Sequence, residues 1–215
     1  MTSLTRNKEW RDEPGTRRGL VERLTKETQI ELALDLDGGE LWKERRLDAP
    51  GGFFVHMLDA LSTHGGLGVE LKATGDTHVD LHHTVEDVGI CLGEALVQAL
   101  GDRKGVVRFA TAYAPLDEAL ARAVVDLSGR GFFVHGMPSE LEHVWVTQDF
   151  PLSLILDFFQ AFADRGRFTL HLDILRARNG HHAAEAAFKA VAVALRQALH
   201  IRGSEIPSTK GTLSA

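Results

Sequence analysis

The alternation of apolar and polar residues near the start of the chain predicts a β-strand. From Thr28 to Leu36 apolar residues occupy every second position, a pattern typical of a strand with one buried face. The Asp37-Gly38-Gly39 turn is expected to lead into a second strand over residues 40–47. The elements expected next are a helix over 53–63, a strand over 67–73 and a long amphipathic helix over 82–100.

The second half of the chain repeats this order of elements. The expected elements are strands over 106–114, 119–127, 132–137 and 144–147, a helix over 152–163, a strand over 168–175 and a helix over 181–200. The long helix of each half opens with a similar motif, His82-His83-Thr84-Val85-Glu86 and then His181-His182-Ala183-Ala184-Glu185. We therefore predict an α+β fold with an internal duplication, in which two similar half-domains, each a sheet with helices on one face, pack as one pseudo-twofold unit.

The duplication sets the expected domain organisation. Residues 25–105 are predicted to form the first α+β half and residues 106–203 the second. Residues 1–24 are polar and contain Pro14-Gly15, so we expect a flexible N-terminal arm. Residues 204–215 are expected to form a C-terminal tail.

Composition narrows the class of protein. The 215 residues include 30 acidic and 24 basic side chains, a formal net charge of −6, so we expect no nucleic-acid partner. No apolar run is long enough to span a membrane, and the charged stretch from Met1 to Glu13 is not typical of a secretory signal. The single Cys91 suits a reducing compartment. We therefore expect a soluble, cytoplasmic protein without a membrane partner.

Histidine is the unusual residue, with 11 copies, and its placement suggests a metal site. Residues four apart share a helix face, whereas adjacent residues point about 100° apart. His82 and Glu86 are thus expected to hold one ion while His83 faces elsewhere, and His181, Glu185 and His182 repeat this division. If the beginnings of the two long helices meet, within a protomer or between protomers, two sites result, each built from a pair and a single histidine.

The short helix of each half offers one more ligand. His56 lies 26 residues before His82, and Asp157 lies 24 residues before His181. By symmetry, one predicted site contains His56, His83, His181 and Glu185, and the other contains Asp157, His82, Glu86 and His182. Imidazole and carboxylate ligands without thiolate suit manganese, iron or zinc.

Further segments carry a family resemblance. They are Thr25-Lys26-Glu27-Thr28, Gly52-Phe53-Phe54-Val55-His56-Met57-Leu58, Pro115-Leu116-Asp117-Glu118-Ala119, Asp126-Leu127-Ser128-Gly129-Arg130 and Pro207-Ser208-Thr209-Lys210-Gly211. With both His-His-x-x-Glu motifs, they resemble the imidazoleglycerol-phosphate dehydratase family over about residues 25–213. Members of this family convert imidazole glycerol phosphate to imidazole acetol phosphate and water in histidine biosynthesis.

The resemblance implies a fold, a cofactor and an assembly. The fold is ribosomal S5 domain 2-like, and each active site holds two Mn²⁺, with iron or zinc as alternatives. The sites lie at subunit interfaces of a large homo-oligomer, an octahedral 24-mer in the family. The small-molecule partner is a phosphorylated imidazole substrate.

The resemblance also implies roles for individual residues. Arg108, Arg130, Ser208 and Lys210 match residues that hold the substrate phosphate, and Lys189 lies close to the metal helix. Glu27 matches a substrate-contacting position and is the candidate base. The implied catalytic residues are Glu27, His56, His82, His182 and Lys189. Two cations beside the imidazole ring would favour an imidazolate that expels the hydroxyl group, making the enzyme a hydro-lyase.

Three positions depart from the family pattern and leave other functions open. Family members usually carry aspartate at Val55 and Leu81, and many carry histidine at Asp157. A missing carboxylate removes a group that orients an imidazole or transfers a proton. Two alternatives therefore stand beside the dehydratase: a metal-stabilised structural homologue with reduced or no activity, and a dinuclear metal-dependent hydrolase.

Overall fold

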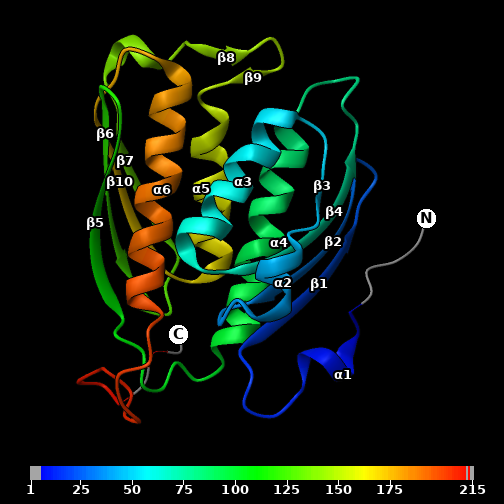
Figure 1. Cartoon of the computed structure of the whole chain (residues 1–215), viewed down its shortest axis with the longest axis vertical. Helices are drawn as coiled ribbons and strands as arrows, with labels where there is room; N and C mark the ends of the chain where they lie inside the picture. Colours follow the sequence, from blue (N-terminus) through cyan, green and yellow to red (C-terminus); the bar gives the residue numbers. More distant parts are fainter. Residues whose placement is uncertain (1–5, 212, 214–215) are drawn as a thin grey trace.

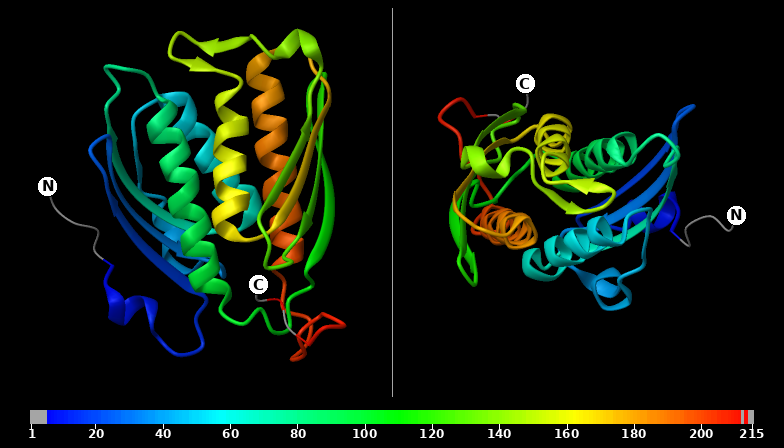
Figure 2. Two further views of the ribbon diagram at one scale, coloured as in Figure 1. Left: turned by 180° about the vertical axis from the view of Figure 1, so that it is seen from behind. Right: turned by 90° about the horizontal axis from the view of Figure 1, so that it is seen from above.

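Two four-stranded sheets enclose a layer of four helices in the computed structural model, which describes residues 6–211 and 213. Figure 2 shows this layering from above, with the first sheet on one side of the helices and the second on the other. Each sheet turns one apolar face toward the helices, so the core fills the space between the sheets. None of the helices described in the structure is long and apolar enough to cross a membrane.

The first sheet has the strand order β1-β2-β4-β3. Its strands are β1 (Arg18–Leu24), β2 (Thr28–Asp35), β4 (Gly68–Gly75) and β3 (Leu47–Asp48). β2 runs antiparallel to both β1 and β4, whereas β3 runs parallel to β4. Along β2 the alternating residues Ile30, Leu32 and Leu34 are buried, as the sequence pattern predicts.

The second sheet repeats this topology and confirms the duplication. Its order is β5-β6-β10-β7, with β5 (Phe109–Leu116), β6 (Ala119–Asp126), β10 (Thr169–Arg176) and β7 (Phe132–Gly136). β6 is antiparallel to both neighbours, and the short β7 is parallel to β10, as β3 is to β4. After β7 the second half adds the η1 turn (Ser139–Leu141) and a β8–β9 hairpin (Trp145–Thr147 and Phe150–Pro151).

The four central helices form two pairs, each made of one helix from either half. They are α3 (Gly52–Gly65) and α4 (His82–Leu100) from the first half, and α5 (Leu154–Gly166) and α6 (Gly180–Ala198) from the second. α4 packs chiefly on α5, and α6 packs on α3. Close approach of α4 and α5 requires Gly93, because a Cβ there would lie 2.6 Å from the Gly166 nitrogen. All four helices begin at the same end of the molecule (Figure 1).

The expectation of a strand over 40–47 is wrong. This segment forms the short helix α2 (Gly39–Glu44) and only then the two-residue β3. Gly38 and Gly39 have positive φ and turn the chain into the helix. Leu41 is the buried residue of α2, so the segment buries one side chain and has no strand-like alternation.

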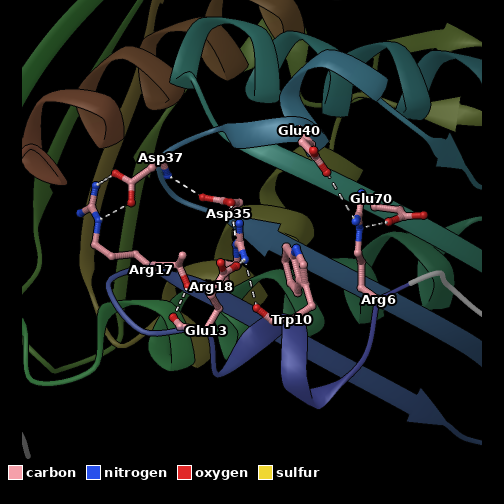
Figure 3. Close-up of polar contacts among 10 residues, drawn as sticks. Arg6, Trp10, Glu13, Arg17, Arg18, Asp35, Asp37, Glu40 and Glu70 are labelled. Atoms are coloured by element: carbon pink, nitrogen blue, oxygen red, sulfur yellow. Dashed lines mark hydrogen bonds and ion pairs between the residues drawn. The ribbon is translucent and has the colours of Figure 1, made fainter.

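The arm expected over residues 1–24 is ordered in its second part. Residues 18–24 form β1, which the pattern misses because only Gly19 and Val21 face the core. Residues 8–11 form α1 (Lys8–Arg11), and Figure 3 shows Trp10 of this helix beside Arg18 on the outer face of the first sheet. Residues 1–5 of the expected arm, and 212, 214 and 215 of the expected tail, lie outside the described residues.

Salt bridges attach the arm to the first sheet. Arg6 lies 3.5 Å from Glu70, a nearly buried residue of β4, and Arg18 lies 2.9 Å from the buried Asp35 of β2 (Figure 3). Arg17 contacts Asp37 at 2.6 Å. The arm therefore covers acidic side chains on the face of the sheet that points away from the helices.

Candidate metal centre

The shared starting end of the four helices gathers the predicted ligands. His82 is the first residue of α4, and His181 is the second residue of α6. His56 and Asp157 lie in the first turns of α3 and α5. Because α3 packs on α6 and α5 on α4, each long helix meets the short helix of the other half.

Three of these side chains converge in what we call the His56 triad: His56, His181 and Glu185. The Nε2 atoms of His56 and His181 each lie 3.2 Å from the same oxygen of Glu185, Oε2. One ligand atom from each of the three residues lies within 4.8 Å of the others, which is the arrangement needed to hold a cation. Phe53 supports it, with its ring packed edge-on against His181 at 5.0 Å between centroids.

Glu185 is held as a carboxylate by its neighbours. Its other oxygen, Oε1, accepts a hydrogen bond from Lys189 at 2.6 Å. Burial alone would raise the pKa of Glu185, but the hydrogen bonds from Lys189 and His56 outweigh it and lower that pKa to about 2. Lys189 therefore lies next to the triad, one helical turn after Glu185 on α6.

The second group, the His82 triad of His82, Glu86 and Asp157, has a different geometry. Glu86 Oε2 lies 3.8 Å from His82 Nε2, whereas Asp157 Oδ2 lies 3.5 Å from His82 Nδ1. The imidazole thus stands between two carboxylates instead of converging with them on one point. The side chains of all three are 41–47% exposed.

The remaining two histidines of the motifs join neither triad. His83 Nδ1 lies 3.0 Å from Asp76 Oδ2, and His182 Nδ1 lies 2.8 Å from Glu118 Oε2. The hydrogen bond with Asp76 raises the pKa of His83, and the hydrogen bond with His182 lowers the pKa of Glu118 to about 2. Within the described part of the protomer, three of the four side chains predicted for the first site converge, whereas those of the second lie near one another without converging.

Glu27 lies at the same end of the molecule. It occupies the turn between β1 and β2, and its charge acts on His83. Asp87 of α4 fixes this turn, since it accepts a hydrogen bond from the Thr28 hydroxyl group and forms an ion pair with Arg23 at 2.9 Å. The structure thus brings the candidate base next to the start of α4.

The predicted phosphate-binding residues, Arg108, Arg130, Ser208 and Lys210, lie at the opposite end. The backbone N–H of Arg108 donates to the carbonyl of Ala198, at the end of α6. Its guanidinium group binds Asp126 at 2.8 Å and the Pro207 carbonyl at 2.7 Å, which brings the tail alongside. The 19 residues of α6 span about 28 Å, so these residues and the triads of one protomer cannot contact one small substrate.

Comparison with known proteins decides the family. The family model described as imidazoleglycerol-phosphate dehydratase matches residues 50–195. The enzymes of that name from Cereibacter sphaeroides and Acidiphilium cryptum are 46% and 48% identical to the chain, covering 92% of it and all of each relative. The chain belongs to the imidazoleglycerol-phosphate dehydratase family. This membership makes it a hydro-lyase.

Solved structures agree with this assignment. The imidazoleglycerol-phosphate dehydratase of Staphylococcus aureus superposes with a TM-score of 0.71 at 34% identity, covering 86% of this chain and 99% of that one. The Pyrococcus furiosus structure gives 0.73 at 32% identity, with 89% and 99% covered. The predicted fold class is therefore confirmed.

Leu81 and Val55, two positions where the chain departs from the family pattern, lie directly before His82 and His56 and are at least half-buried. Leu81 precedes His82 as the N-cap residue of α4; its apolar side chain is buried and has no atom that could cap a backbone group. Asp80 takes that task by accepting the N–H of His82 at 2.8 Å. Val55 is half-buried in the first turn of α3. Neither residue supplies a carboxylate to its neighbouring histidine.

Sequence reasoning missed Asp76 and did not assign a role to Glu118. Asp76 follows β4 by one residue, and Glu118 lies in the turn between β5 and β6. They lie 7 and 64 residues from the histidines they contact, and neither belongs to the helix that carries its histidine, so helical spacing does not relate them. The signal that points to Glu118 is its motif, Pro115-Leu116-Asp117-Glu118-Ala119, which belongs to the resemblance.

Proposed function

We propose that this chain catalyses the family reaction, the dehydration of D-erythro-imidazole glycerol phosphate to imidazole acetol phosphate in cytoplasmic histidine biosynthesis. The observation that carries the proposal is the His56 triad, in which residues from both halves converge on one point. The family membership supplies the substrate and product. It also weighs against a dinuclear hydrolase.

The donor set fits divalent transition metals. Two imidazole nitrogens and a carboxylate, without thiolate, suit manganese, and iron or zinc are alternatives. One ion would be held by His56, His181 and Glu185, and the other by His82, Glu86 and Asp157. His83 and His182 would complete these sites. Bound as a pair, the two Mn²⁺ would supply Lewis acidity to the imidazole ring of the substrate.

Completing each site requires a second copy of the chain. His83 and His182 are held by Asp76 and Glu118, away from the triads of their own protomer. The predicted phosphate-binding residues lie a helix length from the triads. We therefore propose a large homo-oligomer, with the octahedral 24-subunit arrangement of the family, whose active sites lie at subunit interfaces.

Individual residues of the chain would then have separate roles in the reaction. Arg108, Arg130, Ser208 and Lys210 would hold the phosphate group and so fix the position of the ring. Glu27 would remove the proton from the C–H bond, and the hydroxyl group of the neighbouring carbon would leave as water after protonation. The resulting enol becomes the ketone. Lys189 would hold the Glu185 carboxylate and contact the substrate.

A structural homologue without activity is the second candidate. The geometry of the His82 triad favours it, because its two carboxylates contact different nitrogens of one ring. Such a protein would bind metal at the His56 triad but would not be stabilised by the substrate.

Product formation separates these candidates. Purified protein is incubated with Mn²⁺ and imidazole glycerol phosphate, and imidazole acetol phosphate is measured. We expect product that depends on Mn²⁺, is lost with EDTA and is absent from the His82→Ala and His182→Ala variants. A protein that binds Mn²⁺, gains no thermal stability from the substrate and forms no product would be a structural homologue.

A further inference from the structure

The duplication places one glutamate in each of two equivalent hairpin turns. Glu27 directly precedes β2, and Glu118 directly precedes β6, the matching strand of the second sheet. Each turn lies beside the start of the long helix of its own half: Glu27 acts on His83, and Glu118 contacts His182. The two glutamates are therefore counterparts, each next to the histidine that joins no triad.

Glu118 is fully engaged. Its Oε2 atom accepts the N–H of His182 Nδ1 at 2.8 Å, and its Oε1 atom accepts the backbone N–H groups of Arg178 and Asn179 at 3.2 and 3.1 Å. An ionised carboxylate only accepts hydrogen bonds, so the proton must be on Nδ1. The lone pair of His182 Nε2 is thereby left available, and the Asp117 carboxylate lies 4.0 Å from it.

In the first half a different residue contacts the Nδ1 atom of the histidine. Asp76, immediately after β4, lies 3.0 Å from His83 Nδ1. The matching position after β10 is Ala177, which has no polar side chain. Glu27 acts on His83 through its charge, and within the described residues its side chain forms no hydrogen bond or ion pair.

We propose that Asp76 and Glu118 are positioning residues, which fix His83 and His182 in the tautomer that presents Nε2 to a metal ion held by the triad of a neighbouring copy. The use of Asp76 in the first half also leaves Glu27 unbound and free for proton transfer. This inference rests on the proposed two-metal site. A carboxylate behind a ligating histidine orients the ring and increases its basicity, and its loss lowers metal affinity by about 10- to 100-fold.

Asp76 gives the cleaner test, because Glu118 also holds the backbone at the start of α6. We compare wild type, Asp76→Ala and Asp76→Glu, with Glu22→Ala, an exposed carboxylate of β1, as the matched control. Affinity is measured from the EPR signal of unbound Mn²⁺ in titrations of the full oligomeric protein. Thermal unfolding of the metal-free variants reports any loss of fold.

We expect Asp76→Ala to bind Mn²⁺ about 10- to 100-fold more weakly, with unchanged metal-free unfolding, and Asp76→Glu to recover part of the affinity. A crystal structure of the Mn²⁺-loaded wild type should show ligation through Nε2 of both histidines. Wild-type affinity in Asp76→Ala, or ligation through Nδ1, would overturn the inference. Neither measurement depends on turnover, so a wild type that binds Mn²⁺ this way without forming product would contradict the proposed function alone.

Discussion

The two triads contain the same kinds of side chain in opposite arrangements. In the His56 triad, two imidazoles meet at one oxygen of Glu185, whose side chain is 13% exposed. In the His82 triad, one imidazole lies between Glu86 and Asp157, and every member is more than 40% exposed. The side chains of the first triad already converge on one point, whereas those of the second would have to rearrange to do so.

Two substitutions between the halves accompany the contrast, His56 against Asp157 and Lys189, which holds Glu185, against Ile90. α3 contributes His56, whose Nε2 atom reaches the Glu185 carboxylate, while α5 contributes Asp157, whose shorter side chain reaches only His82 Nδ1. An ion at the His82 triad must first separate that aspartate from the ring. The comparison teaches that a duplicated fold can keep the positions of two clusters while changing how their side chains are arranged. We expect the His56 triad to bind metal more tightly.

The largest expected effect comes from removing an imidazole. His181→Ala should lower Mn²⁺ affinity at the tighter site by at least about 100-fold, because it breaks the convergent triad. His82→Ala should remove only the weaker ion, yet both variants should lose turnover, since the proposed mechanism uses two ions. Metal content after dialysis at limiting Mn²⁺, measured with turnover, checks this. Loss of the tighter ion in His82→Ala, with retention in His181→Ala, would reverse the ranking of the triads.

A smaller effect is expected from a substitution that makes the metal affinities of the two triads more alike. Asp157→His introduces the imidazole that the family resemblance implies at this position and frees His82 Nδ1, so we expect about 10-fold tighter binding of the second ion. Isothermal titration with Mn²⁺ measures it, with Asp164→His on the exposed side of α5 as the control. An unchanged second affinity would mean that Asp157 does not set the difference.

The charge of Glu185 should appear in the pH dependence of stability. Its pKa is lowered from 4.5 to about 2 in the folded protein, so the unfolded state binds its proton first as the pH falls. The stabilisation is complete above pH 4.5 and is lost as the pH approaches 2. Metal-free wild type should therefore lose melting temperature over this window more steeply than Glu185→Gln. Parallel curves for the two proteins would contradict the assignment.

The smallest expected difference between the halves concerns the N-caps of α6 and α4, which should contribute unequally to the free energy of unfolding. Asn179 caps α6 by accepting the N–H groups of His181 and His182, whereas Asp80 accepts a single N–H at the start of α4. We expect Asn179→Ala to lower the free energy of unfolding by about 1 kcal/mol and Asp80→Ala by about 0.5 kcal/mol. Urea denaturation of the metal-free protein measures both. A larger loss in Asp80→Ala would invert the comparison.

Most of the fold could be predicted from the sequence because its periodicity is strong. α4 begins and ends at the predicted residues, and the repeated motif implies a repeated topology. β1 and α2 could not be predicted in the same way. β1 turns a glycine to the core so that α4 can approach, since a Cβ at Gly19 would lie 2.1 Å from the Ala95 carbonyl oxygen. The apolar residues of this strand, Leu20, Val21 and Leu24, do not alternate, so the sequence shows no strand pattern there.

The candidate site was predictable where symmetry governs it. Helical spacing and the duplication together grouped His56 with Glu185, and Asp157 with His82. The contacts of His83 and His182 with Asp76 and Glu118 were not predictable, because strand ends and hairpin turns bring these carboxylates in from positions without a fixed spacing. The metal roles of all these residues stay predictions.

Complementation between two inactive variants tests the central claim most directly. Glu185→Ala breaks the His56 triad, and His83→Ala removes the histidine proposed to reach that triad from another copy. The two proteins are stripped of metal, mixed and reassembled with Mn²⁺. If the sites are shared between copies, some interfaces pair an intact triad with an intact His83, and the mixture regains part of the dehydratase activity that neither variant shows alone. A mixture as inactive as its components, despite verified subunit exchange, would contradict shared sites.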